Sequence, residues 1–160
     1  MSNLLLTFVS VLYLFNLILF TMSHLISSSA LVSVIGAEKN NNGADFTIKS
    51  LKTGKDYTYA ISRSEFKGNW YTHIKVETGY LQFTRLGSYK GGKILNKGKV
   101  VDTPSAVAIA FVLAKVEEGK IDFLDANVEV MHKGCCLRCG RTLTDAQSIE
   151  RGLGPVCVNL

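Results

Sequence analysis

The chain has no cysteine before residue 135 and no Asp, Glu, Lys or Arg before residue 38. The first absence excludes disulfide staples spread along the chain. The second divides the protein into a hydrophobic leader, residues 1–37, and a soluble part that carries the whole net charge of +5. A phosphate-binding glycine loop is also lacking, because Gly91-Gly92 and Thr53-Gly54-Lys55 do not have the required spacing.

The leader is apolar over Leu4–Met22, which is about the length that a helix needs to cross a bilayer. As a membrane anchor, it would leave the lysines from Lys39 onward in the cytoplasm. As a signal peptide, it would be cleaved near Ser28-Ser29-Ala30, although no basic segment precedes its apolar core. In a third interpretation, Met22 is the true start, residues 1–21 are absent from the mature protein, and the protein is soluble in the cytoplasm.

A polar linker at residues 38–45 is expected to lead into a β-meander over residues 46–101, where period-two alternation prevails. Thr78-Gly79 predicts a hairpin turn. The alternation in residues 70–77 separates two faces of a strand, with Trp70, Thr72, Ile74 and Val76 on one and Tyr71, His73, Lys75 and Glu77 on the other.

One helix is predicted over Ala106–Val116, with Asp102 or Thr103 as its N-cap, Pro104 in its first turn and Gly119 at its end. This helix carries apolar side chains on nearly all of its sides, so we expect it to be buried against the meander.

The predicted fold class is therefore α+β. A small antiparallel β-meander covered by one apolar helix, with a further strand within residues 121–131, forms a basic body at residues 46–131. A hydrophobic N-terminal helix precedes this body, and a zinc knuckle plus short helix follows it at residues 132–160.

The four cysteines predict the zinc site. Cys136 and Cys139 form a C-x2-C pair, which can present two thiolates to one ion from a tight turn. Cys157 ends the sequence Gly152-Leu153-Gly154-Pro155-Val156-Cys157, whose glycines and proline suit a second turn and a third thiolate.

A closed structural zinc site needs four ligands. We expect His132 to be the fourth, and Cys135 is the alternative, although adjacent cysteines rarely both reach one tetrahedral ion without strain. A short helix is expected between the ligands, with Thr144 and Gln147 as its capping box and Gly152 at its end. Such a unit has little core of its own, so zinc would stabilise its fold.

The segment Cys136–Cys157 resembles the C-x2-C-G-R-x-L-T-x-x-x-S-I-x-x-G-x-G-P-x-C motif of an uncharacterised family of small phage, plasmid and bacterial proteins. Members often carry a His-x-Gly lead-in, matched by His132-Lys133-Gly134, and often a proline where this chain has Ala146. The resemblance is strong over about the last thirty residues and weaker over the β-rich region before them. It implies a zinc module and a mobile-element origin, but no activity.

Two disulfide bridges are the alternative use of the cysteines and would suit an exported protein. The cysteines cluster at metal-ligand spacing, which favours zinc. Since zinc thiolates in turn favour a reducing compartment, we expect the body to be cytoplasmic.

Basic and aromatic side chains are interleaved along the body, which favours a sheet that binds DNA or RNA through phosphates and stacked bases. The candidate residues are Tyr71, His73, Lys75, Arg138 and Arg141. The alternative is that the aromatic side chains fill the core and the lysines solvate turns, since +5 is only modestly basic.

An enzyme is not expected, because His73 and Glu77 share a strand face with no nucleophile or metal partner in view. The sequence predicts a zinc-binding, mobile-element-like protein that binds nucleic acid. The alternative is a membrane-associated interaction or structural module, with residues 4–22 in the bilayer and zinc serving only to stabilise the tail.

Overall fold

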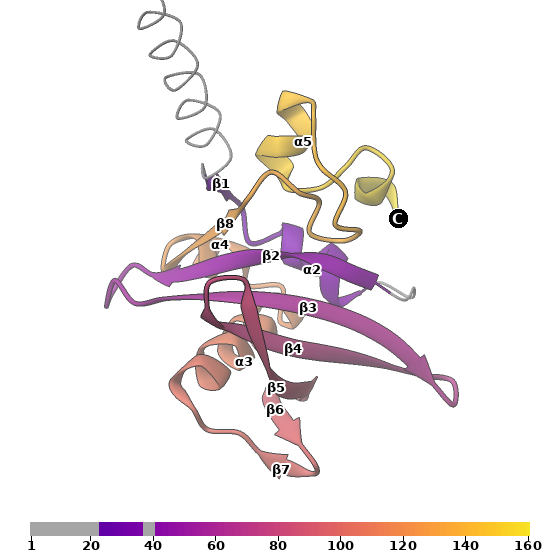
Figure 1. Ribbon diagram of the computed structural model, residues 1–160. Coiled ribbons are helices and arrows are strands. Elements are labelled where there is room, and N and C mark those ends of the chain that lie inside the picture. Colours follow the sequence, from indigo (N-terminus) through magenta and orange to yellow (C-terminus); the bar gives the residue numbers. More distant parts are fainter. Residues whose placement is uncertain (1–22, 37–40) are drawn as a thin grey trace, which may run out of the picture.

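The computed structural model describes residues 23–36 and 41–160, which form an α+β fold around one antiparallel sheet of eight strands (Figure 1). The strand order is β1-β8-β2-β3-β4-β5-β6-β7. The predicted membrane-spanning segment, within residues 1–22, lies outside the described residues. Among those that are described, no helix has the length and apolar character needed to span a bilayer.

The strands are β1 His24–Ile26, β2 Asn41–Ser50, β3 Asp56–Phe66, β4 Asn69–Gly79, β5 Gln82–Lys90, β6 Lys93–Asn96, β7 Lys99–Val100 and β8 Val128–His132. The helices are α2 Ala30–Ile35, α3 Pro104–Glu117, α4 Ile121–Asp125 and α5 Ala146–Arg151, with a final 3-10 turn, η1 Cys157–Asn159.

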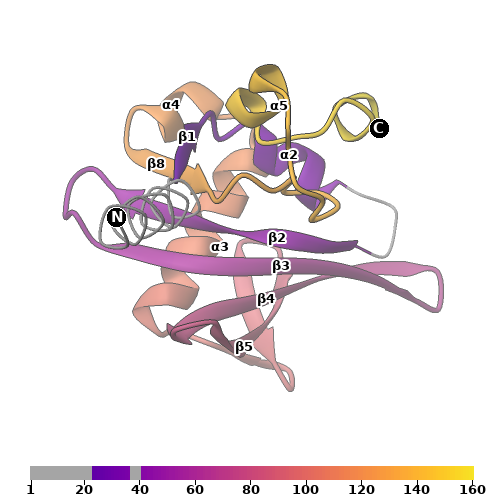
Figure 2. The ribbon, with the colours of Figure 1, turned by 45° about the horizontal axis from the view of Figure 1, so that its top comes forward.

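One face of the sheet is covered, and the core lies between it and the helices. Figure 2 shows α3 behind the strands. Tyr59 of β3 and Ile74 of β4 are fully buried, as is Leu113 of α3. The Tyr59 hydroxyl also donates a hydrogen bond of 2.7 Å to the backbone oxygen of Ser105, which ties the sheet to the start of α3.

The alternation predicted for residues 70–77 is confirmed in β4. Thr72, Ile74 and Val76 are buried, whereas Tyr71 and Lys75 are exposed on the other face. A half-buried sheet requires this period of two, because successive side chains point to opposite faces.

The predicted helix is confirmed, but its complete burial is not. Thr103 caps α3 by accepting a hydrogen bond of 3.4 Å from the Ala106 amide, and Gly119 follows its end with a φ of 70°. Val107 and Phe111 remain 55% and 45% exposed. The described sheet covers only one side of α3, so the apolar side chains on its outer side face solvent.

The chain enters the folded body earlier than we expected. Within the predicted leader, β1 joins the sheet and α2 buries Ala30, Leu31 and Val34. Within the predicted linker, β2 begins at Asn41 and pairs with Arg63 of β3, with a bulge between Asn42 and Asp45. Strand pairing thus overrides the weak strand preference of the asparagines.

Residues 121–131 hold a helix and a strand rather than the single strand that we expected. The helix α4 occupies Ile121–Asp125, and β8 begins at Val128. β8 lies between β1 and β2, so that His132 pairs with both His24 and Phe46. These partners are far away in the sequence, and no local pattern indicates them.

The close approach of β5 and β6 at Gly87 yields the first prediction. A Cβ on Gly87 would lie 2.3 Å from the Leu95 backbone oxygen, and the φ of Gly87 is 155°. Gly98 also has a positive φ, 77°, but no atom lies within 4 Å of the place that its Cβ would take. We expect Gly87→Ala to lower the free energy of unfolding by about 3 kcal/mol or more, since backbone would have to move, and Gly98→Ala by about 1 kcal/mol.

Urea denaturation of the two variants measures this difference. Equal stability losses would contradict the close backbone approach.

Candidate metal centre

Three of the predicted ligands meet at one point. The sulfur atoms of Cys136, Cys139 and Cys157 all lie within 4.8 Å of one another. A tetrahedral ion bound at about 2.3 Å from each sulfur would hold them roughly 3.8 Å apart. All four cysteines of the chain are free thiols. The donor set therefore fits a metal ion, as the C-x2-C spacing predicted.

A tight turn presents the first two cysteines. The Cys136 amide donates to the Arg141 oxygen, and the Gly140 amide donates to the Cys136 oxygen, both at 2.8 Å. Gly140 has a φ of 74°, which closes the turn without strain in a residue that lacks a side chain.

The surroundings of the cysteines shift the pKa values of two of the thiols in opposite directions. Burial raises the pKa of Cys136, but amide hydrogen bonds from Gly154, Cys139 and Arg138 outweigh it and hold this pKa below its ordinary value. Burial raises the pKa of Cys157 to about 12, with contributions from hydrogen bonds to the other two thiols. A bound divalent cation would favour the thiolate form of its ligands, because metal ligation requires deprotonated cysteines.

The helix α5 and the turn after it bring Cys157 back to the pair. Asp145, rather than the expected Thr144, caps α5 and accepts a hydrogen bond of 2.8 Å from the Ser148 amide. Gly152 ends the helix with a φ of 69°, as predicted. Its backbone oxygen accepts from the Leu137 amide at 3.0 Å, which fixes the turn against the knuckle.

The two candidates for the fourth ligand, His132 and Cys135, lie outside the cluster of three cysteines. The His132 ring is fully buried, with Nε2 2.8 Å from the Ile149 oxygen and Nδ1 accepting from the Gly134 amide at 3.1 Å. Cys135 is partly buried and forms an antiparallel bridge with Thr142. Their role as fourth ligand stays a prediction.

The two arginines near the site differ in their surroundings. Arg138 is 9% exposed and donates a hydrogen bond of 3.2 Å to the Cys157 oxygen, so its guanidinium holds the last turn in place. Arg141, by contrast, is exposed.

Tyr71, His73 and Lys75 lie together on the uncovered face of β4. His73 is held across three strands, with Nε2 2.7 Å from Ser64 Oγ and Nδ1 2.9 Å from Ser88 Oγ. Burial, and then the nearby Arg85 guanidinium, lower the pKa of His73, so its ring is neutral at pH 7.

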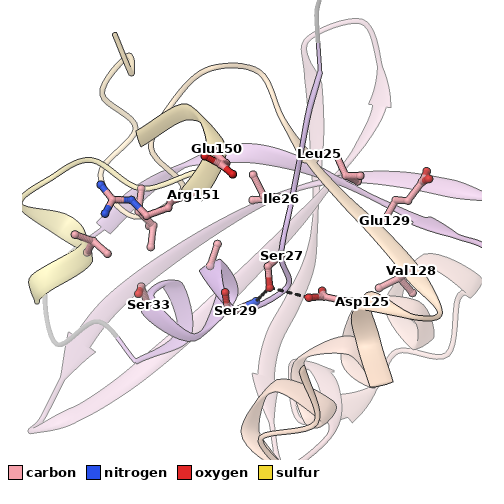
Figure 3. Close-up of a pocket in the computed structure, with 13 residues that line it drawn as sticks. Leu25, Ile26, Ser27, Ser29, Ser33, Asp125, Val128, Glu129, Glu150 and Arg151 are labelled. Carbon is pink, nitrogen blue, oxygen red and sulfur yellow. Dashed lines mark hydrogen bonds between the residues drawn. The ribbon is translucent and has the colours of Figure 1, made fainter. Parts of the chain in front are cut away.

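A cavity of about 680 Å³ lies beside the metal module, among β1, α2, β8 and α5 (Figure 3). Sequence reasoning missed it, because its lining comes from both ends of the chain. At one end of the cavity, Asp125 accepts hydrogen bonds of 2.7 Å from the Ser27 hydroxyl and the Ser28 amide. These bonds tie the segment before α2 to the end of α4.

Comparison with known protein families gives a match over the C-terminal module. The profile of a family of unknown function, DUF6011, matches residues 126–159. This span contains the three clustered cysteines and agrees with the predicted resemblance of the C-terminal module to an uncharacterised family. No curated protein and no solved structure matches the chain.

The hydrogen bonds of Asp125 predict a dependence of stability on pH. Burial raises the pKa of Asp125, but the bonds from Ser28 and Ser27 outweigh it and hold this pKa below its ordinary value. The contribution of the carboxylate is therefore complete above the unfolded pKa of about 4 and is lost as the pH falls through the lower folded value. We expect Asp125→Ala to cost about 1 kcal/mol of unfolding free energy at pH 7, because the group is largely exposed, and less below pH 4.

Urea denaturation across pH tests this, with Asp56→Ala as the matched control at an exposed position. A loss that is the same at pH 3 and pH 7 would contradict the role of the carboxylate.

The cysteine cluster predicts the metal content of the protein. We expect one divalent ion per chain. In the presence of a competing chelator, Cys139→Ser should lose the ion and Cys135→Ser should retain it, because Cys139 belongs to the cluster of three cysteines and Cys135 does not. Elemental mass spectrometry of full-length protein, purified without a metal-affinity tag, measures the content. Loss of the ion from Cys135→Ser alone would contradict the assignment.

Proposed function

We propose that the protein binds one zinc ion through Cys136, Cys139 and Cys157, and that it binds nucleic acid through the uncovered face of its sheet. The choice of zinc rests on the donors. Three thiolates suit zinc, whereas magnesium and calcium prefer oxygen ligands. In this proposal the ion stabilises the C-terminal module, and the sheet makes the contacts with the partner.

One observation carries the nucleic-acid proposal: four exposed cations share the uncovered face of β4, β5 and β6. Lys75 pairs with Arg85, and Lys90 pairs with Lys93, on the face that also bears His73 and Ser88. Within the described part of the chain, none of these four cations forms an ion pair with a carboxylate. Cations that are free of carboxylates are available to neutralise phosphates.

Aromatic side chains accompany the cations. Tyr71 is 40% exposed and lies nearly parallel to the His73 ring, at 13°, with their centroids 6.4 Å apart. At the tip of the β3–β4 hairpin, Phe66 is 61% exposed and Lys67 lies 5.3 Å from its ring centroid. Such rings can stack on the bases of a single strand, and a neutral His73 can add a further flat surface.

The outer side of α3 favours the alternative class, a protein-interaction module. Phe111 of α3 contacts Phe123 of α4 at a centroid distance of 6.3 Å, and both rings are partly exposed beside Val107. A groove of about 340 Å³, with a mostly apolar lining, runs between α3 and the β6–β7 hairpin. An exposed apolar surface of this kind is typical of contacts with other proteins.

Reversal of two charges on the uncovered face tests the nucleic-acid proposal. We expect Lys75→Glu with Arg85→Glu to weaken binding of single-stranded nucleic acid at least tenfold, because two phosphate contacts are lost and replaced by repulsion. The slope of log affinity against log salt should become shallower by about 1.4, at about 0.7 per lost phosphate contact. Filter binding across a salt series gives both quantities.

Lys52→Glu with Lys55→Glu is the matched control, since it makes the same change in net charge at the exposed β2–β3 turn. An equal loss in this control would indicate a general charge effect. No salt-dependent binding by the unaltered protein would reject the nucleic-acid proposal and favour the interaction module.

A further inference from the structure

The source of a fourth metal ligand is restricted by the sequence. All four cysteines and all three histidines of the chain fall among the described residues. His73 lies on the uncovered face of β4 between two serines, and His24 of β1 lies against the ring of His132, 5.4 Å between centroids. Of the nitrogen and sulfur donors outside the cluster, His132 and Cys135 are therefore the two to weigh.

Both ring nitrogens of His132 already have partners in the backbone. Nδ1 accepts from the Gly134 amide, so Nε2 carries the proton and donates to the Ile149 oxygen. An imidazole that binds an ion through either nitrogen must give up one of these bonds and leave a partly buried backbone group unpaired, which costs on the order of 1 kcal/mol.

These bonds indicate a structural role for His132 instead of metal ligation. Its ring joins the last residue of β8 to the end of α5, and the Cα of Gly152 lies so close that a Cβ there would be 3.7 Å from His132 Cδ2. The same Cβ would lie 2.7 Å from Ile26 Cδ1 of β1. His132 thus lies in the contact between the sheet and the metal module.

Cys135 is oriented by its backbone. It pairs with Thr142 in an antiparallel bridge, and successive side chains of such an extended segment point to opposite sides. Since Cys136 Sγ belongs to the cluster, Cys135 is directed away from it. The cluster itself is open on one side, because Cys139 is exposed while Cys136 and Cys157 are buried.

From this geometry we propose that the ion is held by three thiolates and keeps its fourth coordination position for an exchangeable ligand from outside the chain. This inference rests on the proposed zinc function. It differs from the expected Cys3His ligand set, because His132 becomes a positioning residue instead of a ligand. Three thiolates and one divalent cation leave a net charge of −1, so a neutral donor adds no further repulsion. The external ligand is a neutral donor, namely water, which an added imidazole can replace.

Cobalt(II) in place of zinc makes the ligand set visible by absorption, and free imidazole is the probe. We expect the full chain to bind one cobalt ion with a thiolate charge-transfer band. Imidazole should shift the visible d–d bands saturably, at one imidazole per cobalt, while the charge-transfer band keeps its intensity because no thiolate is displaced. Cys135→Ser should give the same cobalt spectrum and the same response.

His132→Gln separates positioning from ligation. We expect this variant to keep the cobalt stoichiometry and the position of the d–d bands while it melts at a lower temperature. A closed site with four protein ligands would show no response to imidazole, which overturns the inference and leaves the metal function intact. Altered d–d bands in Cys135→Ser, or in folded His132→Gln, would also overturn it. A chain that binds no cobalt would instead overturn the proposed metal function.

Discussion

The pairing of β8 with β1 on one side and β2 on the other is the contact on which the remaining arrangement depends. Val130 of β8 pairs with Ile26 and with Ile48, and all three side chains are buried. This double pairing joins the segment before α2 to the sheet and fixes the direction in which the chain enters the metal module. The metal module follows β8 directly, and His132 at the end of β8 contacts the Ile149 oxygen of α5, so the position of the module depends on β8.

Two regions with opposite electrostatic character result from this arrangement. The sheet carries exposed cations on the β4–β6 part of its uncovered face, whereas the cysteine cluster becomes an anionic site once its thiols ionise. The buried guanidinium of Arg138 lies within the module and is bound to the Cys157 oxygen, so it serves the module rather than the surface. The polyanion binding and the metal binding that we propose therefore involve separate places on one small fold.

The sequence predicted those features that local patterns encode. Alternation in β4, the Thr103 cap of α3, the glycine that ends α5 and the three clustered cysteines all follow from residue spacing. Features that depend on distant partners were missed, such as β1 and α2 inside the apolar leader and the start of β2 at Asn41. Asp145 caps α5 in place of Thr144. The prediction chose the wrong neighbour because both residue types suit an N-cap and spacing alone does not distinguish them.

The position of β1 at the edge of the sheet has a consequence for the order of folding. His24, near the beginning of the described chain, pairs with His132, which the ribosome adds much later. The meander of β2 to β7 can form from neighbours as it emerges, but β1 must wait for β8 without a strand partner. Contacts of such long sequence separation slow folding, so the closing of the sheet at β1 is expected to be a late step that follows synthesis of most of the chain.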